Sequence, residues 1–146
     1  MEETKKANFQ FVGFQVIKSL IEKKGFDKVG KDMQVGFNPR GERDSKKNIF
    51  NLYLGVQISN KEKSFIVDID IVGFFKYSNE DNEAIIKNYF YINAPAILFP
   101  YIRAYISSLT ALSGFETITL PTINFTFLGD TLKEHTIEVN SDINLE

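Results

Sequence analysis

Residues 93–115 form an apolar stretch that can fold only as a helix shielded from water. The stretch carries one charge, Arg103, and two prolines near its start. Its apolar side chains recur at alternating steps of four and three, which places them on one narrow helical face of the kind that two packed helices share. This face, called the helix seam below, consists of Leu98, Ile102, Tyr105, Leu109 and Leu112. The pattern predicts a helix that packs on a partner surface and ends at Gly114.

A membrane span is the alternative for an apolar segment of this length. Arg103 lies near its centre, where it would cost about 2.5 kcal/mol or more in a bilayer. Pro100 removes a backbone donor and is expected to bend the helix. Four hydroxyl side chains lower the apolarity further: Ser107, Ser108, Thr110 and Ser113. A buried or interfacial helix of a soluble protein fits better, without direct membrane insertion.

Composition limits the remaining classes of protein. A chain of 146 residues predicts one domain, 1–146, in which 140–146 is expected to be a flexible tail. The net charge is −2 and lysine and arginine are not gathered on one face, which argues against a nucleic-acid partner. The chain has no cysteine, and its N-terminus lacks the apolar segment of a secretory signal, so a cytoplasmic location is expected. Its 14 Phe and 6 Tyr predict an exposed apolar binding surface.

The N-terminal half reads as strands. Apolar and polar residues alternate over 50–58 and 65–75, which predicts a hairpin with its turn at 60–63. Alternation over 33–37 predicts a shorter strand that stops at Pro39 and is followed by a charged loop from Arg40 to Asn48.

The first strand carries a change of pattern. The apolar parity that begins at Phe9 switches across Gly13, which predicts a β-bulge there. Residues 17–22 also fit a helical face, so a helix stays open for them.

The second half reads as helices. Ser78 or Asn79 can cap a helix whose first turn is acidic, and its expected inner face is Ile85, Ile86, Tyr89 and Phe90. After Phe125, the pair Gly129-Asp130 interrupts the pattern, and residues 131–139 fit helix or strand. Strands followed by helices predict an α+β fold with an antiparallel sheet covered on one side.

Catalytic chemistry is scarce in this sequence. His135 is the only histidine, and no nucleophile motif accompanies it, so a solvated histidine is the simpler interpretation. Asp68 and Asp70 share one face of a strand, a spacing that could serve a metal or an acid–base pair. Without further ligands, a solvated sheet face is the simpler interpretation of these carboxylates. We therefore expect neither an enzyme nor a bound metal or cofactor.

Two motifs resemble a known family. The helix motif Ile97-Leu98-Phe99-Pro100-Tyr101-x-Arg103, followed by Ile106-Ser107-Ser108-Leu109, and the later segment Ile118 to Phe125 are similar to the signature helix and the next landmark of the SecB family of bacterial chaperones. The resemblance implies a four-stranded antiparallel sheet covered on one face by helices. It also implies a homotetramer, a dimer of dimers with the long helices at the interface, so the helix seam would lie between subunits.

The functional implication is ATP-independent holding of unfolded preproteins in a long apolar groove. By resemblance, the groove would be bounded by the second strand and by the loop before the last helix. The matching positions are Met33, Val35, Phe37, Ile118, Leu120, Ile123 and Phe125. The alternative is that these residues only pack in the core. Alternation alone does not distinguish the core-facing side of a strand from the wall of a groove.

The family also docks on the export motor SecA through a carboxylate patch on the exposed sheet. Glu22, Ile66 and Asp68 match that patch, and Asp70 neighbours it, but Lys18 stands where the family commonly has aspartate. The chain is also less acidic than the family usually is. These departures leave two alternatives to an export chaperone: a chaperone dedicated to a single client such as an antitoxin, and a domain that binds a small apolar ligand.

Overall fold

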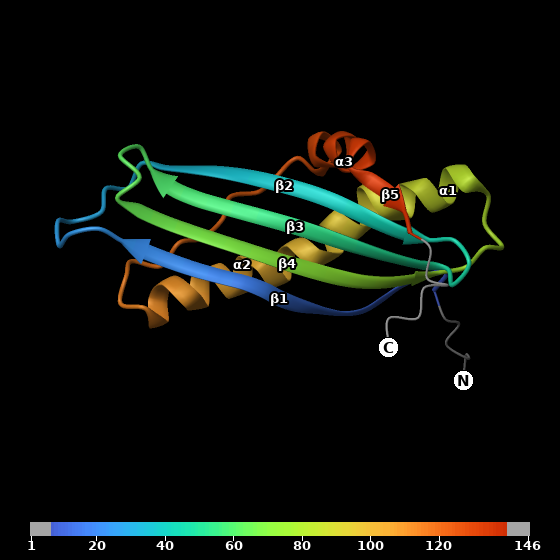
Figure 1. Cartoon of the computed structure of the whole chain (residues 1–146), viewed down its shortest axis with the longest axis horizontal. Helices are drawn as coiled ribbons and strands as arrows, with labels where there is room; N and C mark the ends of the chain where they lie inside the picture. Colours follow the sequence, from blue (N-terminus) through green and yellow to red (C-terminus); the bar gives the residue numbers. More distant parts are fainter. Residues whose placement is uncertain (1–6, 140–146) are drawn as a thin grey trace.

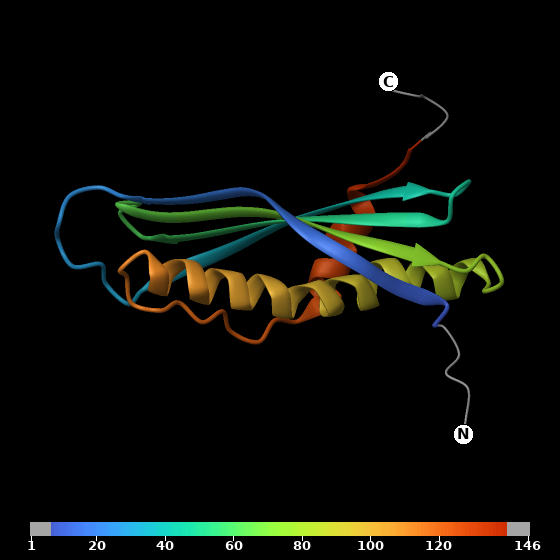
Figure 2. The ribbon, with the colours of Figure 1, turned by 90° about the horizontal axis from the view of Figure 1, so that it is seen from below.

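The computed structural model describes residues 7–139 and shows a sheet with helices packed on one face (Figures 1 and 2). Four long antiparallel strands make up most of the sheet: β1 (Phe9–Lys23), β2 (Met33–Asp44), β3 (Ile49–Asn60) and β4 (Phe65–Tyr77). A short fifth strand, β5 (Thr136–Glu138), extends the sheet to the order β1-β4-β3-β2-β5. The predicted α+β class and the hairpin of β3 and β4 are confirmed. The expected four strands are corrected to five.

Strand β1 contains the predicted bulge. Its pairing with β4 shifts register between Phe11 and Gly13, and again between Val16 and Lys18. Beyond the second shift, Lys18 to Lys23 pair with Asp70 to Phe65 in an unbroken antiparallel ladder. The helical alternative for residues 17–22 is therefore wrong, because ladder hydrogen bonds to β4 occupy the backbone that a helix would need.

Strand β2 does not stop at Pro39, and the predicted loop from Arg40 is wrong for its first residues. Gly41 N–H donates to the carbonyl oxygen of His135, on the side of β2 that faces away from β3. Because backbone N–H groups two residues apart point to the same side of a strand, Pro39 turns its missing donor toward this outer edge. The ladder to β3 thus loses nothing at Pro39, and the strand continues to Asp44.

Strand β5 lies beside this part of β2. It pairs in parallel with Gly41 to Arg43. A Cβ atom on Gly41 would lie 2.6 Å from Thr136 Oγ1 and 2.8 Å from the ring of Phe50. A glycine at this position therefore lets β5 close on the sheet edge above a buried ring.

The helical layer begins later than predicted. Helix α1 (Glu83–Asn88) starts after Asn82, whose side chain accepts a hydrogen bond from Ile85 N–H at 3.0 Å, so Ser78 and Asn79 do not cap it. A π-helical turn, η1 (Tyr89–Asn93), then joins α1 to the long helix α2 (Ala94–Leu112). Of the expected inner face, Ile86 and Phe90 are buried, whereas Ile85 is exposed.

Helix α2 ends as predicted. Gly114 adopts φ +84°, its N–H donates to Ala111, and Phe115 N–H donates to Thr110. These two reverse hydrogen bonds form a Schellman motif, which satisfies carbonyl groups at the helix end. The chain turns sharply here and runs back beside α2.

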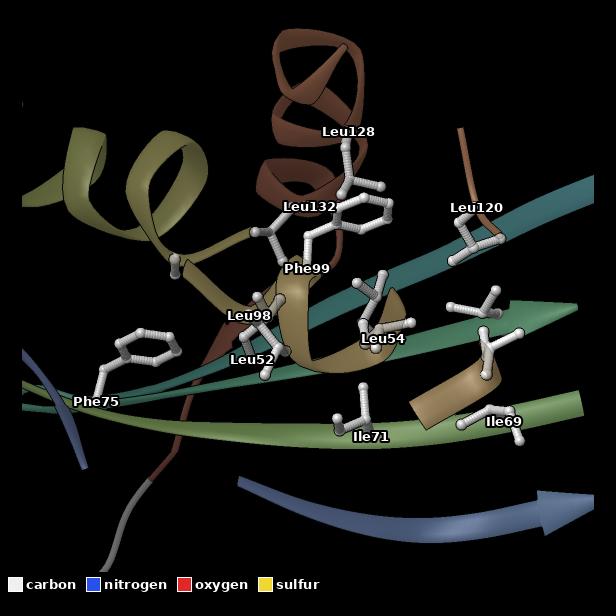
Figure 3. Close-up of a cluster of buried hydrophobic side chains, with 14 of the residues drawn as sticks. Leu52, Leu54, Ile69, Ile71, Phe75, Leu98, Phe99, Leu120, Leu128 and Leu132 are labelled. Carbon is white, nitrogen blue, oxygen red and sulfur yellow. The ribbon is translucent and has the colours of Figure 1, made fainter. Parts of the chain in front are cut away.

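The core lies between α2 and the sheet. Figure 3 shows Leu98 and Phe99 of α2 near Leu52 and Leu54 of β3. Alternate residues of β3 and β4 point into this layer and are almost completely buried, as the predicted alternation requires.

Helix α3 (Phe125–Glu134) follows an extended loop and lies near β2 and η1. It runs through Gly129 instead of breaking there. A Cβ atom on Gly129 would overlap the carbonyl oxygen of Tyr91, so this glycine permits close packing on η1. The ambiguous segment 131–139 divides into the end of α3 and strand β5. The expected tail 140–146 lies outside the described residues.

Candidate functional site: an apolar cavity between strand β2 and the loop after α2

A cavity of about 830 Å³ lies at one end of the sheet. We call it the loop cavity. Its walls come from two stretches that are distant in the sequence: the β1–β2 connection with the first residues of β2, and the loop that follows α2. Its apolar lining comprises Phe26, Val29, Met33, Val35, Ile58, Phe65, Phe115, Ile118 and Leu120.

The base of the loop cavity belongs to the protein core. Ile58 and Phe65 are buried, and Phe115 meets the ring of Phe65 edge-on with centroids 4.9 Å apart. Leu120 is also buried, and Figure 3 shows it on the loop above β2. The base of the cavity therefore consists of packed core side chains.

The wall formed by residues 115–121 is held against α2 by hydrogen bonds. Ser107 Oγ donates to the carbonyl oxygen of Ile118 at 2.9 Å, and Ile118 N–H donates to Thr110 Oγ1 at 3.0 Å. Arg103 Nη2 donates to the carbonyl oxygen of Pro121 at 3.3 Å. These bonds supply the partners that an extended loop without its own ladder would otherwise lack.

The structure brings four of the predicted groove residues together in this cavity. Met33 and Val35 come from β2 and are half-buried, while Ile118 and Leu120 come from the loop. All four contribute to one apolar surface. Binding of a client to this surface stays a prediction.

The other three predicted groove residues do not line the loop cavity. Phe37 and Phe125 are half-buried, and both contact Phe99, with ring centroids 6.4 Å and 5.3 Å from it. Ile123 packs against the core nearby. The second strand and the loop thus carry apolar residues beyond the cavity, toward α3.

Sequence reasoning missed several parts of this site. Phe26 and Val29 follow no periodic pattern, and Phe115 comes just after the end of a helix. Each lies in an irregular segment, where hydrophobic periodicity gives no signal. Lys23, Lys28 and Lys31 also line the cavity, and only the folded chain shows that they gather there.

The predicted docking residues lie on the sheet face opposite α2. Val67, Ile69 and Ile71 are buried beneath α2, so Asp68 and Asp70 between them point to the other face. Glu22 of β1 lies directly opposite Ile66 of β4 in the ladder between these two strands. All four predicted docking positions therefore share one face of β1 and β4.

Lys18 is part of this face and changes its charge. Its Nζ lies 2.7 Å from Asp68 Oδ2. This hydrogen bond, together with the charge of Asp68, raises the pKa of the Lys18 ammonium. Lys18 therefore remains protonated and offsets part of the negative charge that a carboxylate patch would present.

The residues of the helix seam differ in burial. Leu98 and Ile102 are completely buried against the protein's own sheet. Their predicted place at a subunit interface is wrong, because neither side chain has surface left to meet another subunit. Tyr105 is half-buried and donates a hydrogen bond to Ser19 Oγ at 2.7 Å, Leu109 is half-buried, and Leu112 is 88% exposed. For these three residues the interface stays a prediction.

Between residues 7 and 139, no group of three or more His, Cys, Asp or Glu side chains is placed to hold a metal ion. His135 is exposed at the end of α3, with Nδ1 2.8 Å from the carbonyl oxygen of Thr131. In the same part of the chain, the helices are too short or too polar to cross a membrane.

The sequence is similar to those of known proteins. Curated relatives are named Protein-export protein SecB. One, from Buchnera aphidicola, is 41% identical over 83 residues, covering 55% of this chain and 58% of the relative. Another, from Roseobacter denitrificans, is 25% identical over 122 residues, covering 80% of this chain and 73% of the relative. The match to the first of these thus spans just over half of that protein's length.

A solved structure has a similar fold. A SecB-like chaperone of Mycobacterium tuberculosis, solved in complex with a peptide from an antitoxin, superposes with a TM-score of 0.66. It is 17% identical and covers 80% of this chain and 88% of that one. The family model described as preprotein translocase subunit SecB matches residues 24–135, which include the loop cavity wall, α2 and α3. The chain belongs to the SecB family.

Proposed function

We propose that this chain is a holdase chaperone that binds unfolded segments of preproteins in the loop cavity without ATP. The observation that carries the proposal is a partly exposed apolar lining built on a base of packed core side chains. Met33, Val35 and Ile118 are half-buried, so apolar surface is available at a hollow. Extended segments bind such surfaces by side-chain burial, which contributes about 25 cal/mol per Å² of apolar area and requires no fixed sequence motif.

A small apolar ligand is the competing occupant, since a volume of about 830 Å³ also suits one. Phe26 favours a polypeptide. This side chain lines the cavity yet is fully exposed to water. A small ligand enclosed in the cavity would leave the Phe26 ring in water, whereas a polypeptide that crosses the rim of the cavity would cover this ring.

An aggregation assay tests the proposal. The protein is mixed with a slow-folding client, with and without ATP, and light scattering is followed. We expect suppression of aggregation that does not depend on ATP. The double variant Met33→Ser with Ile118→Ser should lose it while keeping the native circular dichroism spectrum. Phe127→Ser is the matched control, because it removes an equally apolar side chain that is 75% exposed on α3, outside the cavity.

Two results would contradict the proposal. One is an undiminished effect in the double variant, which would place client binding outside the loop cavity. The other is an apolar molecule co-purified with the protein in native mass spectrometry, with no effect on clients, which would favour the small-ligand domain.

We further propose that docking on SecA through the open sheet face is weak. The support is the Lys18–Asp68 ion pair, since a cation within the carboxylate patch lowers the potential that would attract a basic partner. Calorimetry with the cognate SecA should show binding that strengthens in Lys18→Asp and weakens in Asp68→Lys. Tight binding that is indifferent to Asp68→Lys would show that this face is not used.

A chaperone dedicated to a single client is the second candidate. The Lys18–Asp68 pair favours it over a general export role, and the structurally similar M. tuberculosis chaperone was solved with an antitoxin peptide. Complete absence of SecA binding, together with one protein recovered in stoichiometric complex from cells, would support this candidate. We place either activity in the cytoplasm and in a homotetramer, with Tyr105, Leu109 and Leu112 among the contacts between subunits.

A further inference from the structure

We propose that the loop cavity selects segments in which an apolar stretch is flanked by carboxylates. The inference rests on the proposed holdase function and names the class of client that the site favours. It follows from the charges around the cavity, which differ in sign from the net charge of the chain.

Cations prevail over carboxylates in the lining. Three lysines line the loop cavity, Lys23, Lys28 and Lys31, against one carboxylate, Glu116. The whole chain, by contrast, has a net charge of −2. The loop cavity is therefore a locally positive region of an acidic protein.

These lysines are available to a ligand. The ion pairs found within residues 7–139 join Lys18 to Asp68, Arg40 to Glu42 and Arg43 to Glu83, and none includes a cavity lysine. Asp27 and Asp32 belong to the same connection between β1 and β2, but both are exposed and neither lines the cavity.

The apolar lining and the lysines suit different parts of one extended ligand. Val29, Met33 and Ile118 offer half-buried apolar surface, while Lys28 and Lys31 are exposed on the connection that borders it. A lysine can lay its methylene chain along apolar surface and keep its ammonium group in water. A bound segment would thus bury its central apolar side chains and present the residues beside them to the ammonium groups.

Carboxylates are the flanking groups that this arrangement favours. A carboxylate beside the apolar stretch would meet lysines that form no ion pair within residues 7–139, whereas a lysine or arginine there would be repelled. Because the lysines are exposed, each contact is weak, and two such contacts together correspond to roughly a fivefold preference. The preference should weaken with salt, since the screening length falls from about 30 Å at 0.01 M to about 3 Å at 1 M.

The test uses three fluorescein-labelled peptides that share one Leu- and Phe-containing centre. Two Asp, two Ser or two Lys flank the centre on each side. Anisotropy titrations of the full chain at 20 mM salt should give an affinity for the Asp peptide about fivefold above that for the Ser peptide, with the Lys peptide weakest. At 500 mM salt the three affinities should converge.

Charge-reversal variants assign the effect to the cavity. Lys28→Glu combined with Lys31→Glu should abolish or invert the preference while the Ser peptide still binds. The control is Lys76→Glu, a single exposed reversal of the same sign at the other end of β4 from Phe65, and it should keep the preference. Equal affinities for the Asp and Lys peptides, or an equal loss of preference in Lys76→Glu, would overturn the selection while leaving the holdase intact. Failure of all three peptides to bind would overturn the holdase itself.

Discussion

The hydrogen bond between Ile118 and Thr110 offers the sharpest test of how the cavity wall is held. Thr110 is completely buried in α2, and its Oγ1 accepts from Ile118 N–H at 3.0 Å. The same hydroxyl donates to the carbonyl oxygen of Ile106 at 2.9 Å. Thr110→Val keeps the shape of the side chain but removes the acceptor for Ile118.

The expected loss of stability in Thr110→Val follows from the Ile118 N–H, which loses its acceptor. An unsatisfied, partly buried N–H costs about 1–3 kcal/mol, whereas the Ile106 carbonyl keeps the backbone donor of the helix. We therefore expect Thr110→Val to lower the free energy of unfolding by about 1–2 kcal/mol. Thr110→Ser is the control, because it keeps the hydroxyl and loses one methyl group, at a cost of about 1 kcal/mol.

Stability alone does not separate the two variants, so hydrogen exchange at the Ile118 amide is the deciding assay. A bond that contributes about 1 kcal/mol slows exchange roughly fivefold. Exchange at Ile118 should accelerate by at least that factor in Thr110→Val and change little in Thr110→Ser. Affinity for an apolar peptide should fall only in the valine variant, because the wall is then no longer held. An Ile118 amide that stays protected in Thr110→Val, with unchanged stability, would refute this account of the wall.

Three further predictions concern other parts of the molecule. Gly129→Ala should destabilise the protein by about 1–3 kcal/mol in urea despite the better helix propensity of alanine, because the new methyl group overlaps the carbonyl of Tyr91; equal or greater stability would be the contrary result. Glu83 pairs with Arg43, whose hydrogen bond lowers the pKa of Glu83 from its usual 4.5, so the pair stabilises the fold above that pH. Glu83→Gln should then cost about 0.5 kcal/mol at pH 7, since the pair is half exposed, and the difference from the parent protein should shrink as the pH falls through the lowered pKa. A difference that does not shrink as the pH is lowered would contradict this. Leu112→Glu should shift the mass measured by light scattering from tetramer toward smaller species, and an unchanged mass would remove Leu112 from the interface.

The sequence by itself determined the elements with a regular period. Alternation defined the hairpin of β3 and β4, the parity switch located the bulge at Gly13, and Gly114 marked the end of α2. These features depend on local rules: the period of two in a strand, and the tolerance of glycine for a left-handed conformation. The two motifs around α2 also sufficed to indicate the family.

The tertiary structure alone decided what each apolar side chain faces. A helical period cannot tell a sheet of the same chain from another subunit, so Leu98 and Ile102 were assigned to an interface although both lie in the core. The continuation of β2 through Pro39 likewise depends on which edge its missing N–H faces, and that is set by the pairing of β2 with β3 on one side and with the distant β5 on the other.

The site divides in the same way. The β2 and loop residues of the cavity could be named from the sequence, because they fall in an alternating strand and in a recognisable motif. Phe26, Phe115 and the cavity lysines could not, because they lie in irregular segments or at a strand end and meet only when the chain turns back after Gly114. The lysines gather around the apolar cavity only when these segments come together in the fold. No local sequence pattern therefore reveals them in a chain whose overall charge is negative.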